Sequence, residues 1–409
     1  MIMVKETMNY KIPTLIFLVA TWLSSTQCST QIPVLHTKGT YFEVGFDMGK
    51  TFKSRIHDYN SKDTELQNRL MPYITSKEGE SVMDKYLIVA QQYYPQYLDE
   101  LKGIAAGSEM PFFQIFVPSI RNELNAHIDG DWGAESCSDV HVNNAQQYAI
   151  GHNEDADPLI KDRAYFVNAT IVDKNGNIVE NFMAYTYPGY LPGNAFGFTM
   201  SGLIISTNAL SPKAFGDLKI PRNYVNRALL AQSTEEGVEK VLLSNGIGGA
   251  YAFSCNFADL KRNPRQSVNY EVTSTKMAVS LVSKKTVNLQ MAKYDISSYD
   301  TTGHYFHFNK FEHPDTVNIP QFLNHTISSI HRRKRAEQLP TPTDITSIKN
   351  ILGDTGDALY PIYRTPRPTD NTSTCATAIY DITRCILFIY TDNPKSASPV
   401  LQIPLPNCS

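Results

Sequence analysis

The spacing of apolar residues divides the chain into helical and strand-forming regions. From about Thr40 to Asn125, apolar residues recur every three or four positions, as in "YPQYLDELKGIAAGSE". This is the period of a helix with one buried face. From Cys137 onward the period shortens to two, which predicts strands whose alternate side chains face a core.

Several strand-like stretches follow Cys137, and helical stretches separate them into groups. Turn signals at Asn175-Gly176 and at Ser201-Gly202 predict hairpins. Helices are predicted where Pro221 suits a first turn, where Ser233 and Glu236 form a capping pattern, and before the stop signal Gly353. The strands are "SDVHV", "YAIGHN", "AYFVNATIVDKNGNIVENFMAYTY", "FGFTMSGLIISTNAL", "YAFSCNFADL", "VNYEVTS" and "KMAVSLVS". Antiparallel strand groups with separate helical blocks predict a single α+β domain built from two sheets layered with helices.

The N-terminus has the order of segments found in a secretory signal. Lys5 and Lys11 precede the apolar run Ile12–Leu23, and small and polar residues follow it. This predicts a signal peptide over residues 1–28, with cleavage between Ser25 and Ser29, and the run is short for a membrane span. A signal-anchor is the alternative. With cleavage, we expect no stable membrane span.

Composition fits a globular protein, and the glycosylation sequons agree with the predicted secretory signal. The 409 residues are 42% hydrophobic and 19% charged, and the net charge of −3 is spread along the chain. This distribution excludes a strongly basic protein surface of the kind that binds nucleic acid. Glycosylation sequons occur at Asn168, Asn324 and Asn371, with another at Asn407 close to the end. The expected location is therefore secreted or lysosomal.

The six cysteines leave an odd number after signal removal. Cys28 departs with the signal, and five remain, which predicts one free thiol in a secreted chain. If the last four pair, Cys137 is the free one. The spacing alone fixes no specific bridge, and Cys375 and Cys385 lie on two arms of a predicted hairpin in a register that does not bring them together.

Cys137 is the candidate nucleophile, because a polar cluster follows it in "ESCSDVHVNNAQQYAIGHNEDAD". A catalytic thiol needs a nearby base or positive charge. Asn153 and Asp155 lie two residues apart, so they share one face if the strand extends that far. A buried structural cysteine followed by turn-forming residues is the alternative reading.

Other reaction centres find little support in the sequence. Candidate histidines for a papain-like site lie downstream, but the local signature around such a cysteine is absent. His304 and His307 lack the spacing of a zinc motif, and neither a phosphate loop nor a dinucleotide fingerprint occurs. His141 and His152 are expected to be satisfied core or surface histidines. We therefore expect no metal and no cofactor, and a cysteine-based amide or ester chemistry remains.

With these residues in place, the chain resembles the family of cysteine N-terminal-nucleophile hydrolases that includes acyl-CoA:6-aminopenicillanic acid acyltransferase and β-alanyl-dopamine hydrolase. The similarity covers nearly all of the mature chain. The segments that carry it are "GTYFEVGFDMGK", "YPQYLDELKGIAAGSE", "CSDVHV" with "GHNEDAD", "GLIISTNAL", "IPRNYVNRALLAQSTEEGVEKVL", "GHYFHFNKF" and "ATAIYDITRCILFIY".

The resemblance implies a four-layer αββα sandwich, made as a precursor that cuts its own backbone. The cut would fall between Ser136 and Cys137, giving a helical N-terminal chain over 29–136 and a C-terminal chain over 137–409 that stay associated. Ser136 stands where the family usually has glycine, and Asp139 stands where the penicillin enzyme has threonine. A penicillin substrate is therefore not implied.

The resemblance also implies roles for individual residues. The freed α-amine of Cys137, with an ordinary pKa of about 7.7 to 8.0, would take the thiol proton without a histidine. Asp155 would orient that amine and assist the cut, and Asn309 would stabilise the oxyanion. Asn153 matches a polar neighbour of the acid, and Thr273 matches a serine of the family site.

The leading hypothesis is an enzyme that cleaves a small N-acyl amide through an acyl-thioester on Cys137, with water or an amine as the acyl acceptor. A lipid-amide hydrolase of the ceramidase type is the alternative on the same scaffold, and it would need a larger apolar pocket. A catalytically silent secreted glycoprotein that binds a ligand is the alternative from another class. The retained Cys137, Asp155 and Asn309 favour the enzyme.

Overall fold

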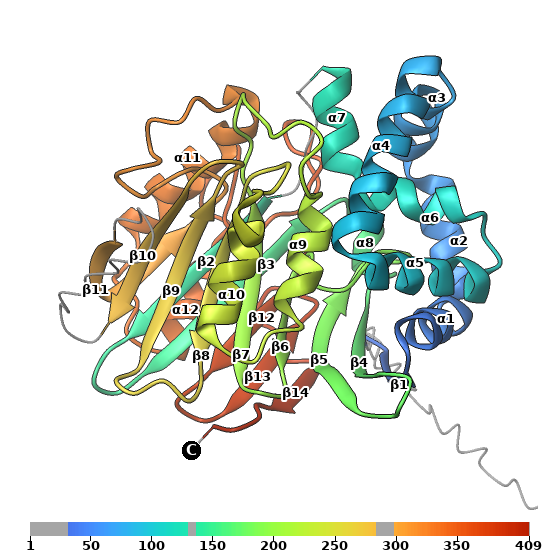
Figure 1. Ribbon diagram of the computed structural model, residues 1–409. Coiled ribbons are helices and arrows are strands. Elements are labelled where there is room, and N and C mark those ends of the chain that lie inside the picture. Colours follow the sequence, from blue (N-terminus) through green and yellow to red (C-terminus); the bar gives the residue numbers. More distant parts are fainter. Residues whose placement is uncertain (1–31, 130–135, 284–297, 409) are drawn as a thin grey trace, which may run out of the picture.

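The computed structural model describes residues 32–129, 136–283 and 298–408 (Figure 1). The predicted signal peptide 1–28 lies outside the described residues. The helical pattern predicted for the first part of the chain is confirmed by α1 (Tyr41–Thr51), α2 (Lys53–Lys62), α3 (Met71–Ile74), α4 (Lys77–Tyr93), α5 (Pro95–Ser108), α6 (Phe112–Ser119) and α7 (Arg121–Ile128), with a short π-helical turn at Leu66–Leu70.

The strands of the described residues form one continuous order that is divided between two sheets. The order is β1 (Val34–Gly39), β4 (Tyr165–Val172), β5 (Ile178–Thr186), β6 (Phe196–Thr199), β7 (Leu203–Ala209), β8 (Phe253–Asp259), β9 (Gln266–Val272), β10 (Met277–Ser283), β11 (Ser298–His307), β2 (Ser136–Asn143), β3 (Tyr148–Ala156), β12 (Ser373–Asp381), β13 (Ile386–Tyr390) and β14 (Leu401–Pro404). The first sheet runs from β1 to β10, and the second runs from β2 to β14.

Strand β11 belongs to both sheets. Its first half pairs with β10 in parallel, and its second half, from Gly303 onward, pairs with β2 in antiparallel fashion. Gly303 has a φ of 86°, a conformation that a residue without a Cβ adopts at little cost. The chain therefore passes from one sheet to the other at this glycine.

Buried apolar clusters separate four layers. One cluster packs the N-terminal helices, α9 (Arg222–Leu229) and α10 (Glu235–Leu242) on the first sheet. A second lies between the sheets and includes Ile150, Phe166 and Phe196. A third packs α11 (Leu323–Gln338) and α12 (Ile345–Leu352) on the outer face of the second sheet. Figure 1 shows α9 and α10 on one side of the strands and α11 and α12 on the other. The α+β class is confirmed, and its layers follow the order αββα.

Helices α1 and α5 touch along their backbones. A Cβ atom added at Gly45 would lie 2.0 Å from the carbonyl oxygen of Glu100, and one added at Gly103 would lie 2.1 Å from that of Phe42. Glycine at both positions permits this close approach. The motif segments "GTYFEVGFDMGK" and "YPQYLDELKGIAAGSE" therefore form one packed helix pair.

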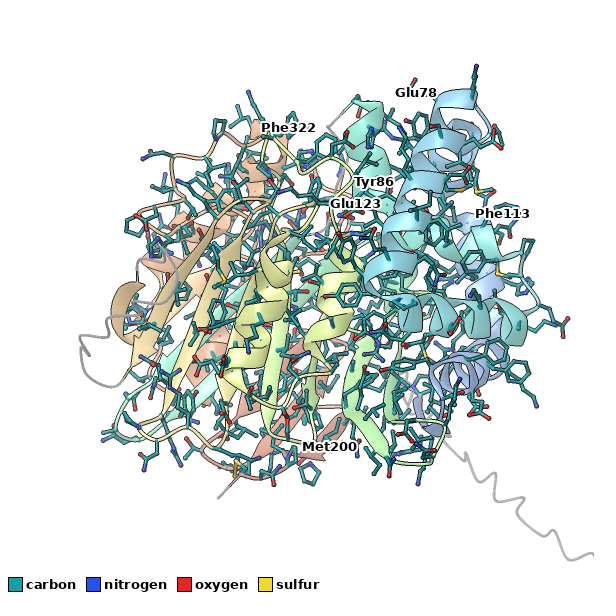
Figure 2. All side chains as sticks on the ribbon, in the orientation of Figure 1. Glu78, Tyr86, Phe113, Glu123, Met200 and Phe322 are labelled. Atoms are coloured by element: carbon teal, nitrogen blue, oxygen red, sulfur yellow. A yellow bond between two sulfur atoms is a disulfide. The ribbon has the colours of Figure 1, made fainter. Side chains whose placement is uncertain are left out.

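Buried charged groups tie the N-terminal helices to the first sheet. Arg227 on α9 donates to Glu100 on α5 at 2.9 Å and pairs with Glu180 on β5 at 2.8 Å, and the Arg227 and Glu100 side chains are fully buried. Glu123 on α7 accepts from the backbone nitrogen of Arg222 at 2.8 Å, at the beginning of α9 (Figure 2). These contacts connect residues on either side of the predicted cut.

The predicted turns and helix ends are confirmed in part. The turns at Gly176 and Gly202 are confirmed by positive φ angles of 83° and 100°, and α12 ends at Gly353 as predicted. The α10 cap is Thr234, whose hydroxyl accepts from the Gly237 nitrogen, so the Ser233 pattern is one residue off. Pro221 is the N-cap of α9, one position before the predicted first turn. Strands β1, β11 and β14, the short α8 (Pro158–Lys161) and α11 were not predicted.

The prediction of one free thiol is wrong. Cys385 and Cys408 form a disulfide, which leaves Cys137, Cys255 and Cys375 unbridged among the described residues. Cys255 and Cys375 are fully buried within strands β8 and β12, where burial rather than pairing accounts for them. Within the described part of the chain, no helix combines the length and apolar character needed to cross a membrane.

Candidate active site

Cys137 lies on β2, between β11 and β3, and only 3% of it is exposed. Its side chain faces the first sheet, because Asp139, on the same face two residues later, accepts from the Ser206 hydroxyl of β7 at 2.8 Å. Across the β2–β3 ladder, Cys137 pairs with Glu154. The Cys137 Sγ atom lies 3.8 Å from Glu154 Oε2.

Side chains hold both backbone polar groups of Cys137. Its N–H donates to Asn309 Oδ1 at 2.7 Å, and its carbonyl oxygen accepts from Arg332 Nη1 at 2.5 Å. Arg332 Nη2 also donates to Asn309 Oδ1 at 2.9 Å and to the Ser136 hydroxyl at 3.2 Å. Arg332 is fully buried on α11. The residues on both sides of the Ser136–Cys137 bond are therefore fixed by one guanidinium group and one amide.

The Cys137 thiol is held in its protonated form. Burial, together with the negative charge of Glu154, raises the pKa of Cys137 to about 12. At neutral pH this thiol needs a proton acceptor before it can act as a nucleophile.

His152 lies close to Cys137 but is not a free base. Its Nδ1 lies 2.9 Å from Asp139 Oδ1 and its Nε2 lies 2.9 Å from Glu154 Oε2. These carboxylates raise the pKa of His152 well above its ordinary value against the effect of burial. With both ring nitrogens donating, the imidazolium has no lone pair for a proton or a metal. His152 and His141 are both fully buried and hydrogen-bonded at both ring nitrogens, so the prediction of satisfied histidines is confirmed.

The three ligand-type atoms of Cys137, His152 and Glu154 lie within 4.8 Å of one another. This spacing alone would suit a small cation. However, the hydrogen bonds of His152 to two carboxylates satisfy the imidazole without one, and binding would require its deprotonation. The cluster is better described as a hydrogen-bonded network of ionisable side chains beside the thiol.

Asp155 and Asn153 lie on the opposite face of β3 from Glu154. Asp155 Oδ1 accepts from the Thr374 hydroxyl at 2.6 Å, and its Oδ2 lies 4.0 Å from Arg332 Nη1. Burial raises the pKa of Asp155 to about 7. Asn153 Nδ2 donates to the Leu352 carbonyl oxygen at 2.8 Å. Asp155 thus reaches Cys137 through Arg332, and Asn153 ties β3 to the end of α12.

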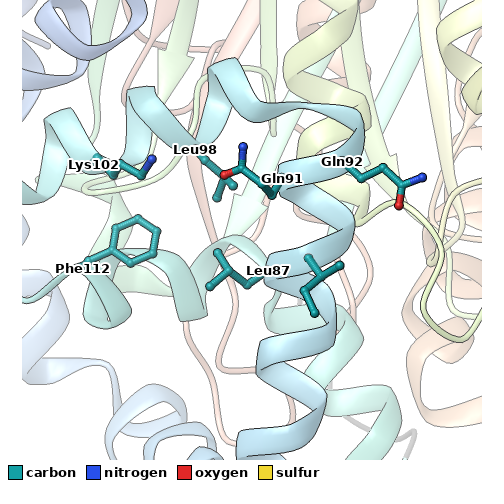
Figure 3. A pocket seen from close by; sticks show the side chains of 7 residues that line it. Leu87, Gln91, Gln92, Leu98, Lys102 and Phe112 are labelled. Carbon is teal, nitrogen blue, oxygen red and sulfur yellow. The ribbon is translucent and has the colours of Figure 1, made fainter.

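Thr273 lies in the turn between β9 and β10. Its hydroxyl accepts from the Lys276 nitrogen at 2.9 Å, and it lines a hollow of about 300 Å³ together with Lys219 and Leu242. A larger hollow of about 490 Å³ lies over α4, α5 and α6, where Leu87, Leu98 and Phe112 line it (Figure 3). Cys137 lines neither hollow.

Two side chains that lie against Cys137, Glu154 and Arg332, were not predicted from the sequence. Glu154 stands between the two residues that were singled out, and only the strand register decides which of the three faces the thiol. Arg332 lies on a helix that buries Thr326, Ser328 and Ser329 beside it. The buried face of this helix is polar, so it shows no apolar stripe from which the helix could be recognised.

Comparisons with known proteins agree on one family. The sequence model of "Acyl-coenzyme A:6-aminopenicillanic acid acyl-transferase" matches residues 142–396. The Beta-alanyl-dopamine/carcinine hydrolase of Drosophila melanogaster is 31% identical over 385 residues, which cover 91% of this chain and 96% of the relative. The similarity to this relative therefore extends over the N-terminal helices as well as the strands.

Proposed function

The chain belongs to the acyl-coenzyme A:6-aminopenicillanic acid acyl-transferase family, as its motifs predicted, and from this membership we propose that it is a self-processing cysteine amidohydrolase with Cys137 as nucleophile. The enzyme class is amide-bond hydrolase or acyltransferase, because the family is named for an acyl transfer and the relative for an amide hydrolysis. The single observation that carries the proposal is that Asn309 and Arg332 form hydrogen bonds with the backbone of Cys137.

In the proposed cut, Cys137 Sγ attacks the carbonyl carbon of Ser136 and the C–N bond breaks. The thiol proton passes to the departing nitrogen, and water then hydrolyses the thioester to leave a carboxyl group on Ser136 and a free amine on Cys137. Asn309 and Arg332 restrain this backbone, which lowers the entropy cost of the attack. The apolar contacts of α1–α7 with the first sheet would keep the two chains together.

In turnover, the freed amine takes the proton of the thiol. Its ordinary pKa of about 7.7 to 8.0 suits a base at neutral pH, and Asn309 Oδ1 is placed to accept a hydrogen bond from it. The sulfur attacks the substrate carbonyl, the leaving amine receives the proton, and water or a second amine releases the acyl group. Asn309 Nδ2 donates one hydrogen to the Ala209 carbonyl oxygen at 3.0 Å, and its second hydrogen can serve the oxyanion.

A small polar acyl group fits this site better than a lipid. The side chains beside the sulfur are Glu154, His152 and Asp139, all buried and hydrogen-bonded, and an apolar acyl chain packed against these polar groups would offer them no hydrogen bond. The relative's name refers to β-alanyl-dopamine and carcinine, and amides of this size are the substrates that we propose here. The ceramidase-like alternative lacks such support.

We propose a secreted or lysosomal location and N-glycosylation. Asn324 and Asn371 are exposed and Asn168 is partly exposed, so the two former sequons are open to modification. The Cys385–Cys408 bridge is of a kind that forms mainly in oxidising compartments.

A denaturing gel of the purified protein tests the cut. We expect two bands that divide near residue 137, with Cys137 at the new N-terminus, and a single band for Cys137→Ala. An active Cys137→Ala variant, or mature protein that never yields this N-terminus, would contradict the proposal. Incubation with β-alanyl amines, acyl-amino acids and ceramides would then identify the substrate.

A further inference from the structure

Asn309 lies in an irregular segment between β11 and α11. Its side chain accepts from the Cys137 nitrogen at 2.7 Å and from Arg332 at 2.9 Å, and it donates to the Ala209 carbonyl oxygen at 3.0 Å. In the proposed cut the Cys137 nitrogen changes from a peptide N–H to an amine, so one of these contacts changes with it. A group that donates to an oxyanion must be held within about 0.5 Å of its working position. The backbone that carries Asn309 therefore needs anchors of its own.

A carboxylate of the first sheet anchors this backbone on both sides of Asn309. Glu271 is fully buried near the end of β9. Its Oε1 lies 3.0 Å from Nε2 of His307, which precedes Asn309 by two positions. The same oxygen accepts from the backbone nitrogen of Glu312 at 2.6 Å, three positions after Asn309. Its Oε2 accepts from the Thr316 hydroxyl. One side chain therefore binds the segment before and after the amide.

Glu271 makes these contacts as a charged acceptor. Burial alone would raise its pKa, but the hydrogen bonds from His307, Thr316 and the Glu312 nitrogen lower the pKa of Glu271 below its ordinary value. Hydrogen bonds to an ionised acceptor are stronger than those between neutral groups. The other ring nitrogen of His307 lies 3.1 Å from the Ser254 hydroxyl on β8. The imidazole is therefore held by two strands of the first sheet.

The rest of the segment is also attached to the first sheet. Phe311 is fully buried in a small cluster with Leu210, which follows β7. The Phe322 nitrogen donates to the Ser211 carbonyl oxygen at 3.2 Å. Cys137, in contrast, lies on β2 of the second sheet. The position of Asn309 relative to the sulfur therefore depends on how firmly this segment is held on the first sheet.

We propose that Glu271 is a positioning residue of the reaction: it holds the backbone on both sides of Asn309 and so fixes the amide that would donate to the oxyanion. This inference rests on the proposed function and adds a residue to its site. Glu271 acts through Asn309 and needs no contact with the substrate. The alternative is that Glu271 only stabilises the fold as the partner of His307. The two roles differ in their effect on the reactions of Cys137.

Two reactions of the self-cut protein separate these roles in Glu271→Gln. Hydrolysis of carcinine or β-alanyl-dopamine, the amides named for the relative, passes through an oxyanion. Alkylation of Cys137 by iodoacetamide displaces iodide from a saturated carbon and forms no oxyanion. We expect kcat for the amides to fall by at least about tenfold, with KM changed by less than about threefold. The alkylation rate should change by less than about threefold.

A double-mutant cycle with Asn309→Ala tests whether the effect passes through this amide. Asn309→Ala alone should lower kcat by about a hundredfold or more. Adding Glu271→Gln should then lower kcat by less than about threefold further, because the group that it positions is already missing. Glu100→Gln is the matched control, since Glu100 is also fully buried and charge-paired but lies among the N-terminal helices. It should leave kcat within about threefold of the wild type.

A wild-type kcat in Glu271→Gln, an equal loss of turnover and alkylation, or an undiminished further loss in the Asn309→Ala background would overturn the inference. If Glu271→Gln fails to fold or to cut, Thr316→Val takes its place, because it removes one donor to Glu271 and keeps the side-chain shape. A fall in kcat of about threefold or more with unchanged alkylation then supports the inference, and an unchanged kcat overturns it. Failure of the proposed function looks different, because the wild type then hydrolyses neither amide and Cys137 is not cut free.

Discussion

The side chains of Cys137 and Asp155 project from opposite faces of the β2–β3 ladder. The register pairs Cys137 with Glu154 and Ser136 with Asp155, and Asp155 contacts Thr374 and approaches Arg332 rather than the sulfur. The acidic residue that directly sets the charge around the thiol is therefore Glu154. The family-derived role of Asp155 in the cut would act through Arg332 and the backbone.

The first prediction separates the two acids by the reactivity of the thiol. Glu154 raises the pKa of Cys137, so Glu154→Gln should lower it and speed alkylation by iodoacetamide about tenfold at fixed pH. Asp155→Asn should change the rate much less, because its carboxylate lies on the other face. Mass spectrometry of the peptide that contains Cys137 measures the rate separately from Cys255 and Cys375. A larger effect from Asp155→Asn would refute this assignment.

The second prediction concerns Arg332 as a positioning residue. Arg332→Met removes the donor to the Cys137 carbonyl, and it removes one of the two arginine charges, with Arg364, that lower the pKa of the buried Asp155. We expect processing to slow by more than about a hundredfold. We also expect the free energy of unfolding in urea at pH 8 to be about 3–5 kcal/mol lower than in the parent protein. Stability is compared in the Cys137→Ala background, so that all chains stay uncut.

The double variant Arg332→Met/Asp155→Asn supplies the control for that experiment. It removes both charges, so at least about 2 kcal/mol of the lost stability should return. Processing should remain slow, because the contact with the Cys137 carbonyl is still missing. If processing recovers together with stability, Arg332 acts only as a structural charge.

The sequence predicted most of the secondary structure but only part of the candidate site. The helical block and the strand groups followed from apolar periodicity, and the position of Cys137 at the start of a strand was correct. The face of each polar residue was not predictable, because a shift of one residue in strand register exchanges Glu154 with Asp155 at the thiol. Arg332 was missed because its helix buries hydroxyl groups in place of an apolar stripe.

The third prediction is a fall in stability between acid and neutral pH. Burial and the nearby Glu180 charge raise the pKa of Glu100 to about 7 from the ordinary value of 4.5. The folded state thus binds this proton more tightly than the unfolded state, and the stabilisation is present below pH 4.5 and lost as pH rises through about 7. The full change from Glu100 is about 3 kcal/mol. Asp155, with its raised pKa, contributes in the same direction.

Urea unfolding of the Cys137→Ala variant at pH 5 and pH 8 measures this effect. The free energy of unfolding of this variant should be higher at pH 5 than at pH 8. Adding Glu100→Gln should make the difference between the two pH values much smaller. Glu43 is a suitable comparison, because it is exposed and its hydrogen bonds to Thr40 lower its pKa. Glu43→Gln should therefore leave the fall intact. An equal pH dependence with and without Glu100 would show that the buried pair with Arg227 does not titrate in this range.

The fourth prediction concerns the Cys385–Cys408 bridge, which closes a loop of 23 residues and ties the end of the chain to the turn between β12 and β13. Such a cross-link stabilises mainly by restricting the unfolded chain, and for this loop length it is worth about 3 kcal/mol. Replacing both cysteines by serine should lower the midpoint of thermal unfolding by several degrees. A reducing agent should lower the wild-type midpoint equally and leave the double variant unchanged. A reductant effect that persists in that variant would mean that another disulfide stabilises the protein.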